Sequence, residues 1–323
     1  MAHERKVIAV MGATGAQGGG LVRAILDDPA SGFLPRAITR DTASDAARRL
    51  ADLGAEVVEA DAGDLPSLEN AFLGARGAFC VTFFWEHFSP DTELQHARNM
   101  AQAARSEGVG HVVWSTLEDT RRFVPLDDPR LPTLMERYKV PHFDAKGEAD
   151  AYFTATDLPV TLLRTSFYWD NLITFGMGPQ AGEDGTLRFT LPMDDAKLPG
   201  IAAVDIGRCA HGIFKAGNAY AGQTIGIAGE MLNGAEMAAR LGDALGQPVV
   251  HHAMDPADYR QLGFPGAADL GNMFQFKRDF ADAYCSARSV DVARQLNPEL
   301  QDFATWVARN RNRIPLEAAG GEG

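Results

Sequence analysis

Apolar positions follow two alternating patterns along the first half of the chain. Short runs rich in apolar residues predict β-strands at 7–10, 36–39, 56–59, 77–82, 111–115 and 160–164. Between these runs, apolar residues spaced three and four positions apart predict helices at 20–26, 46–53, 65–73, 93–107 and 143–154. Asp64 immediately precedes the third helix and is its predicted cap. Regular alternation of apolar strands with helices is typical of a parallel sheet that is covered by helices on both faces.

The second half of the chain is less regular. Its pattern predicts strands at 201–204 and 249–252 and helices at 205–215, 234–245, 255–262 and 270–280. Glycine and proline are frequent from 176 to 200, which predicts a long excursion away from the sheet.

These elements predict an α/β fold, a Rossmann-type doubly wound parallel sheet with a smaller C-terminal α/β lobe. We expect the Rossmann domain to span 1–165, its sheet completed by strands from 160–164 and 201–230. The lobe, residues 166–315, is expected to be interleaved with the sheet and to lie over the carboxyl ends of its strands, where such sheets bind ligands. Residues 316–323 are expected to form a flexible tail.

Composition narrows the classes of partner. The 323 residues include 30 Lys and Arg against 43 Asp and Glu, a formal charge of −13, and we find no basic cluster that would bind a phosphate backbone. Direct binding of nucleic acid is therefore not expected. Apolar runs are shorter than the roughly 18 residues that span a bilayer, and the polar start does not resemble a signal peptide. We expect no membrane partner and a cytoplasmic protein.

A glycine-rich turn lies between the first predicted strand and helix. Its three glycines have the spacing that allows a tight turn, close approach of backbone amides to a pyrophosphate, and packing of the helix on the strand. The helix amino terminus stabilises the anion. The sequence therefore predicts a nicotinamide dinucleotide. The residues expected to contact it are Gly12, Ala13, Thr14, Gly15, Ala16, Gln17 and Gly18.

Residues at two further strand ends are expected to bind particular parts of the dinucleotide. Arg40 follows the second strand, 22 residues after Gly18, where an arginine grips the 2′-phosphate of NADP(H). The adjacent Asp41 is an alternative that would bind the ribose of NAD instead. Asp61 and the amide of Ala62 follow the third strand and are expected to hold the adenine amino group, although Asp61 could also be a helix cap.

The fourth strand ends in Thr82, Phe83 and Phe84, followed by Trp85. Aromatic residues at this edge are expected to wall the nicotinamide side of the cleft. The alternative is an ordinary packed aromatic cluster. Beyond the sixth strand, Tyr168 and Asn171 are expected to close over the nicotinamide carboxamide, or else to pack the loop.

Three residues are candidates for catalysis. Ser115 ends the fifth strand, where short-chain dehydrogenases place the serine that orients a substrate carbonyl. His142 and Lys146 are four residues apart and share one helix face, so both can reach the nicotinamide ribose. The usual proton donor at the earlier position is a tyrosine. A histidine there can donate a proton, contact the cofactor by hydrogen bonding, or lie at the surface.

A metal site is not expected. His251 and His252 are adjacent on a predicted strand, so their side chains point to opposite faces.

Several of these segments together resemble the NmrA-like family, atypical members of the short-chain dehydrogenase superfamily. The resemblance runs from about Lys6 to Pro315 and is closest to the branch of NADPH sensors. The segments that carry it are 12–19, 81–85, 142–148, 262–267 and 272–274.

The resemblance implies a Rossmann domain with a small C-terminal lobe, and NADP held by the glycine turn, Arg40 and Lys146. It also implies cofactor contacts from Tyr168, Trp169, Asp170 and Asn171. Where related chains often have Thr-Asn after the fourth strand, this one has Thr82-Phe83, which favours an apolar nicotinamide wall.

Two functions follow from the residues and the resemblance. The first is an NADP(H)-binding redox sensor that responds to the ratio of NADPH to NADP through a regulatory protein partner, because several family members lack the catalytic tyrosine. The alternative is an NADPH-dependent oxidoreductase that reduces a small carbonyl, quinone or imine-like substrate. A homodimer is a family-level expectation.

Overall fold

The computed structural model describes residues 5–182 and 184–316 and contains a seven-stranded parallel sheet, in the order β11-β6-β5-β4-β1-β2-β3. This order is that of a Rossmann fold, so the predicted fold class is confirmed. The strands are β1 (Lys6–Val10), β2 (Phe33–Thr39), β3 (Glu56–Glu59), β4 (Gly77–Cys80), β5 (Val112–Thr116), β6 (Val160–Arg164) and β11 (Thr224–Gly226).

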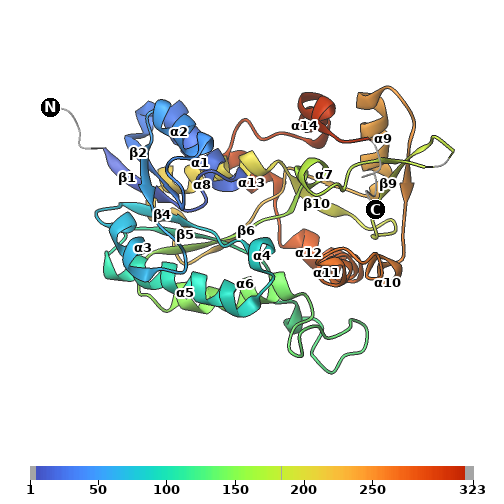
Figure 1. Ribbon diagram of the computed structural model, residues 1–323, viewed down its shortest axis with the longest axis horizontal. Helices are drawn as coiled ribbons and strands as arrows, with labels where there is room; N and C mark the ends of the chain where they lie inside the picture. The colour runs from blue at the N-terminus through green and yellow to red at the C-terminus, as the bar shows by residue number, and fades with distance from the viewer. Residues whose placement is uncertain (1–4, 183, 317–323) are drawn as a thin grey trace.

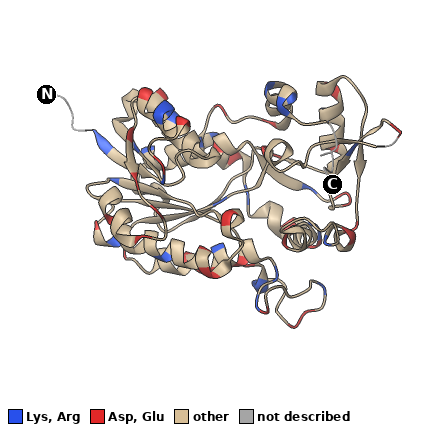
Figure 2. Ribbon diagram, viewed as in Figure 1, with Lys and Arg blue, Asp and Glu red and all other residues tan. Residues whose placement is uncertain are grey.

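Helices cover both faces of this sheet (Figure 1). One layer contains α1 (Ala16–Asp27), α2 (Asp45–Asp52), α8 (Ala203–Lys215) and α13 (Val290–Leu296). The other contains α3 (Leu65–Phe72), α5 (Pro90–Ser106) and α6 (Pro141–Thr154), with the short α4 (Phe84–His87) at its edge. Basic and acidic residues are interspersed along the outer helices and the lobe (Figure 2).

Two small sheets, β12-β10-β7 and β13-β9-β8, build the lobe beside the main sheet (Figure 1). Their strands are β7 (Phe167–Tyr168), β8 (Gln180–Ala181), β9 (Leu187–Thr190), β10 (Leu198–Ile201), β12 (Glu230–Leu232) and β13 (Val249–His252). The helices of the lobe are α7 (Asn171–Thr174), α9 (Gly234–Leu245), α10 (Pro256–Tyr259), α11 (Ala267–Asp279), α12 (Ala281–Ser286) and α14 (Phe303–Asn310). Single 3₁₀ turns lie at Pro29–Ser31, Thr120–Arg122, Gly217–Tyr220 and Arg311–Arg313. A second apolar core, separate from that of the main sheet, fills the lobe.

One local prediction is wrong, and a second is confirmed only in position. The strand predicted at 201–204 ends at Ile201, and α8 begins at Ala203, because the Asp170 carboxylate accepts the Ala203 amide at 2.8 Å and so begins the helix early. Asp64 occupies the cap position of α3, but its side chain makes no capping hydrogen bond. The predicted excursion at 176–200 contains β8, β9 and part of β10, and residues 317–323 of the predicted tail lie outside the described residues.

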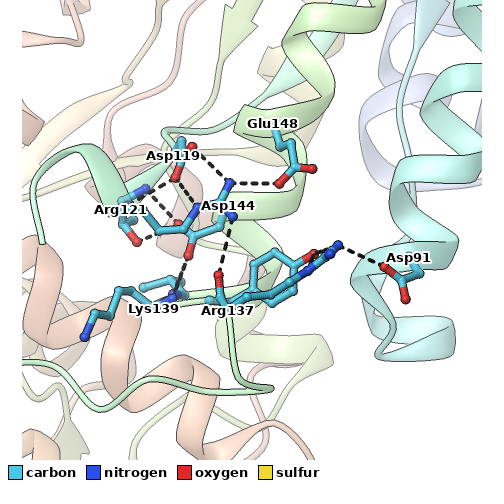
Figure 3. Close-up of polar contacts among 10 residues, drawn as sticks. Asp91, Asp119, Arg121, Arg137, Lys139, Asp144 and Glu148 are labelled. Carbon is cyan, nitrogen blue, oxygen red and sulfur yellow. Dashed lines mark hydrogen bonds and ion pairs between the residues drawn. The ribbon is translucent and has the colours of Figure 1, made fainter. Parts of the chain in front are cut away.

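A network of buried polar groups fixes the start of α6 (Figure 3). The Asp144 carboxylate accepts the backbone amides of Thr120 and Lys139, both at 2.7 Å, and of Val140 at 3.0 Å. The Lys139 ammonium in turn donates to three carbonyls of the preceding loop, at 2.7–3.1 Å. The loop that leads into α6 is therefore held at both ends, which positions the residues of its first turn.

Replacing Asp144 with asparagine is expected to lower the free energy of unfolding by about 1–3 kcal/mol, because an amide group cannot accept on both sides and leaves buried amides without a partner. Chemical denaturation measures this change. Glu148→Gln is the matched control, because Glu148 pairs with Arg121 at a half-exposed site, where such pairs contribute little. Equal losses in the two variants would contradict this role of Asp144.

Candidate functional site

A cavity of about 960 Å³ opens at the carboxyl ends of the sheet strands and continues under the lobe. The glycine turn after β1, the segment after β4, the first turns of α6 and the segment after β6 line one side of it. Residues of α10 and α11, and the loop between them, line the other. The position is the one at which parallel α/β sheets bind ligands.

The glycine turn has the backbone shape that a pyrophosphate requires. Gly12 has φ of +63°, and a Cβ there would lie 2.5 Å from the Phe83 ring. A Cβ at Gly18 would strike the Met11 carbonyl at 2.5 Å and also the Gly12 carbonyl. Gly15 caps α1 without a side-chain hydrogen bond, so the first amides of α1 are available to an anion. These residues fit the diphosphate of a dinucleotide.

Most of the predicted site residues meet at this cavity, but not all. Those that line it are Gly12, Gly15, Ala16, Gln17, Gly18, Thr82, Phe83, Phe84, His142, Lys146, Tyr168 and Asn171. Those that lie outside its lining are Ala13, Thr14, Arg40, Asp61, Ala62, Ser115, Trp169 and Asp170.

Of the predicted residues outside the lining, Arg40 and Asp61 remain near the glycine-turn side of the sheet. Arg40 is exposed and forms an ion pair of 2.7 Å with Glu86, which does line the cavity. Asp61 accepts the Gly63 amide at 2.6 Å and is exposed. Trp169, by contrast, is buried in the core of the lobe, and Asp170 begins α8.

Ser115 reaches the cavity through Gln17. Its hydroxyl donates to Gln17 Oε1 at 2.8 Å, and Gln17 Nε2 donates to the Tyr168 hydroxyl at 2.7 Å. Burial raises the pKa of Tyr168 to about 12, so this phenol stays protonated at neutral pH. The chain of hydrogen bonds links β5, α1 and β7 at the cavity wall.

Lys146 is paired with a buried carboxylate that the sequence analysis did not identify. Its ammonium lies 2.8 Å from Glu93 Oε1 and 2.5 Å from the Thr82 hydroxyl, and Glu93 is fully buried. Burial by itself raises the pKa of Glu93, but the charge and hydrogen bonds of Lys146, together with those of His87 and Thr82, outweigh it and hold that pKa at about 2. Glu93 therefore fixes the Lys146 ammonium at the cavity wall.

His142 is buried and oriented by Asp269 of α11. Its Nδ1 lies 2.7 Å from Asp269 Oδ1, and its backbone amide donates to Oδ2 at 3.2 Å. Because a carboxylate accepts, Nδ1 carries a proton, and Nε2 has no hydrogen-bond partner among the described residues. The surface position considered for His142 is excluded, since the residue is 6% exposed. A carboxylate that orients an imidazole in this way is a common arrangement in acid–base catalysis.

Aromatic side chains after β4 form both a wall and a packed cluster. Phe83, Phe84 and Trp85 all line the cavity, and Phe84 is also buried in the cluster. Trp85 also packs on the far side of the cavity, because a Cβ at Gly266 would lie 2.8 Å from its ring. Gly266 has φ of +88°, a conformation that suits glycine. The loop before α11 therefore closes against Trp85.

The lobe side of the cavity was largely missed by the sequence analysis. Its lining is mainly apolar and aromatic, with Lys277 as its one charged residue, and it includes Tyr259, Leu262, Phe264, Met273, Lys277 and Tyr284. The sequence analysis predicted helices at 255–262 and 270–280 but assigned none of these residues to the site. Within 5–182 and 184–316, no helix has the length and apolar character needed to cross a membrane, and no three His, Cys, Asp or Glu side chains gather as a metal site.

Comparisons with known proteins agree with this architecture. FrzB, an NmrA-like family domain-containing oxidoreductase from Cladobotryum sp, is 28% identical over 316 residues, which cover 90% of each chain. The negative transcriptional regulator NmrA, crystallised with NADP, has a TM-score of 0.73, 23% identity and 95% coverage of each chain. The triphenylmethane reductase of Citrobacter sp., complexed with NADP(H), has a TM-score of 0.72 and 19% identity, covering 94% of this chain and 99% of its own.

A family model also matches the chain. The model of the NmrA-like family matches residues 4–307, which include both the Rossmann sheet and the lobe. The resemblance expected from the sequence is therefore confirmed, and the chain belongs to the NmrA-like family.

Proposed function

We propose that the protein is an NADP(H)-dependent oxidoreductase that transfers a hydride from the nicotinamide to a small carbonyl, quinone or imine-like substrate. The observation that carries this proposal is the continuity of the cavity, which runs from the glycine turn past His142 and Lys146 into an apolar chamber under the lobe. A dinucleotide on the glycine turn would leave that chamber free for a substrate.

Different residues of the chain hold different parts of the cofactor in this proposal. The amides of the glycine turn and α1 bind the diphosphate, and Lys146 donates to the nicotinamide ribose. Phe83 and Trp85 exclude water from the nicotinamide side. When bound, NADPH supplies the hydride.

Replacing Gly18 with alanine is expected to weaken NADPH binding by about 10- to 100-fold, because the new Cβ would push α1 away from the Met11 and Gly12 carbonyls. Isothermal titration with NADPH measures the loss. Gly242→Ala on α9 is the control, since α9 does not line the cavity and a Cβ there would meet its nearest neighbour, the Gln247 carbonyl, at 3.1 Å. An unchanged affinity in Gly18→Ala would show that the turn does not hold the diphosphate.

Arg40 is the residue proposed to distinguish NADP from NAD. Replacing it with alanine is expected to weaken NADPH binding by about tenfold or more, and NADH binding much less, because the guanidinium binds only the 2′-phosphate. In the free protein Arg40 pairs with Glu86 at 2.7 Å. Glu86→Gln removes this competitor and is expected to tighten NADPH binding. Equal losses for NADPH and NADH in Arg40→Ala would refute the assignment.

The test of turnover is NADPH consumption with quinones, aldehydes and ketones. The proposal predicts oxidation with at least one class. A redox sensor, the other function considered from the sequence, predicts none, together with different affinities or sedimentation for NADPH and NADP. That alternative is favoured by the histidine at the position of the usual tyrosine, and by the description of the similarly folded NmrA as a negative transcriptional regulator.

A further inference from the structure

Lys277 of α11 is a buried lysine on the wall of the cavity. It is 2% exposed, and its one hydrogen-bond partner among the described residues is the Met273 sulfur, at 3.2 Å. Four aromatic rings surround its ammonium, with centroids 5.3–5.8 Å away; they belong to Phe143, Phe167, Phe274 and Tyr284.

The charge of Lys277 is not balanced by a carboxylate. Glu118 is near enough to influence it but is bound by Arg288, whose nitrogens lie 2.7 and 2.9 Å from the two carboxylate oxygens. Burial, with the charge of Arg288 adding to it and that of Glu118 opposing it, lowers the pKa of Lys277 to about 7. About half of the Lys277 side chains are therefore neutral at pH 7 unless a bound anion stabilises the charged form.

Tyr284 offers a second donor beside Lys277. Its hydroxyl is buried and has no hydrogen-bond partner in the part of the chain that the structure describes. Its ring lines the cavity and lies 5.4 Å from the Lys277 ammonium. A buried hydroxyl without a partner, and a buried ammonium whose one acceptor is a thioether sulfur, are costly, so the pair is arranged for a ligand that accepts hydrogen bonds.

We propose that Lys277 and Tyr284 form an anion subsite that binds an acidic oxygen, a carboxylate or phenolate, on an aromatic substrate. This inference rests on the proposed function and names its substrate class. Residues of α11 lie at both ends of the proposed substrate site. Asp269 orients His142 at one end, and Lys277 follows eight residues later, about 12 Å along the helix axis. The aromatic walls suit a substrate of one ring or of two fused rings.

The complement of charges supports this subsite. Among the residues that line the cavity, Glu86 is the one carboxylate, and it faces Arg40. Lys146 is already paired with Glu93. Lys277 is therefore the lining cation that lacks a carboxylate within ion-pair distance among the described residues.

The test is a binding experiment without hydride transfer. 2-Naphthoate and its neutral counterpart, 2-naphthamide, are titrated into the NADP⁺-loaded protein and into Lys277→Met, which matches the length of the side chain and suits its apolar cage. The wild type is expected to bind naphthoate about tenfold or more tightly than the amide. Lys277→Met should lose that preference, and Tyr284→Phe should reduce it.

A second measurement uses the wild type alone. At pH 8 the free Lys277 is mostly neutral, while Arg288 stays protonated, Glu118 ionised and Tyr284 neutral, so naphthoate binding should take up nearly one proton; naphthamide binding should take up none. Titration calorimetry in buffers of different ionisation enthalpy measures this uptake. No naphthoate binding, no preference over the amide, an unchanged preference in Lys277→Met, or no proton uptake would each overturn the subsite.

These outcomes separate the subsite from the proposed function. A protein that binds naphthoate as described but oxidises NADPH with no substrate would retain the subsite and contradict the oxidoreductase. An active reductase whose Lys277→Met variant prefers naphthoate over naphthamide as the wild type does would retain the oxidoreductase and contradict the subsite.

Discussion

Replacing Lys146 with methionine is expected to lower the free energy of unfolding by about 3–5 kcal/mol and to abolish tight NADPH binding. The loss of stability arises because Glu93 is fully buried and would be left without the cation that pairs with it. The loss of binding arises because the ammonium is the proposed donor to the nicotinamide ribose. Denaturation and titration calorimetry measure the two effects separately.

The two effects of Lys146 are distinguished by a second substitution. Glu93→Gln removes the buried charge, so the double variant Lys146→Met, Glu93→Gln should regain much of the stability and none of the cofactor affinity. If the double variant binds NADPH like the wild type, Lys146 has no direct role in binding.

The ion pair between Lys146 and Glu93 also makes the stability of the fold depend on pH. The pKa of Glu93 is held at about 2 in the folded protein, below the ordinary 4.5. Its contribution to stability is therefore fully present above pH 4.5 and is lost as the pH falls towards 2.

Replacing His142 with phenylalanine is expected to lower kcat by about 10²- to 10⁴-fold while leaving the NADPH affinity nearly unchanged. In the proposed reaction, the imidazolium donates its Nε2 proton to the substrate oxygen as the adjacent carbon gains the hydride, and Asp269 stabilises the charged ring. The neutral imidazole is then protonated again from solvent. Steady-state kinetics across a pH series measure this role.

Two controls accompany His142→Phe. Asp269→Asn should lower kcat, because it removes the carboxylate that accepts from His142 Nδ1 and orients the ring. His96→Gln on α5 should leave kcat unchanged, since His96 does not line the cavity. Equal kcat in His142→Phe and the wild type would assign the proton transfer to another group.

Local signals carried most of what could be predicted. The glycine turn is recognisable because its glycines are required by backbone atoms close to them in the sequence. At Gly18, for example, a Cβ would clash with the Met11 and Gly12 carbonyls. His142 and Lys146 are linked by the helical repeat alone. The Rossmann sheet follows from its strand and helix periods, whereas the lobe strands, only two to four residues long in β7–β10, are too short to show a period.

Partners distant in sequence account for what was missed. Asp269 meets His142 across 127 residues, and nothing in its neighbourhood distinguishes it from a surface carboxylate at a helix start. Glu93 and Lys277 are charged residues on helices, which normally face solvent; their burial follows from packing between elements. Trp169 and Asp170 were expected from the resemblance to contact the cofactor, and that role stays a prediction.

The most direct test of the oxidoreductase is transfer of deuterium. NADPH carrying deuterium at the reactive C4 position is incubated with the wild-type protein and a panel of aromatic aldehydes and ketones, with and without a ring carboxylate, and the products are analysed by mass spectrometry. The account predicts one deuterium at the carbonyl carbon of at least one product, with His142→Phe markedly slower. Saturating NADPH binding with no deuterium in any product would contradict it.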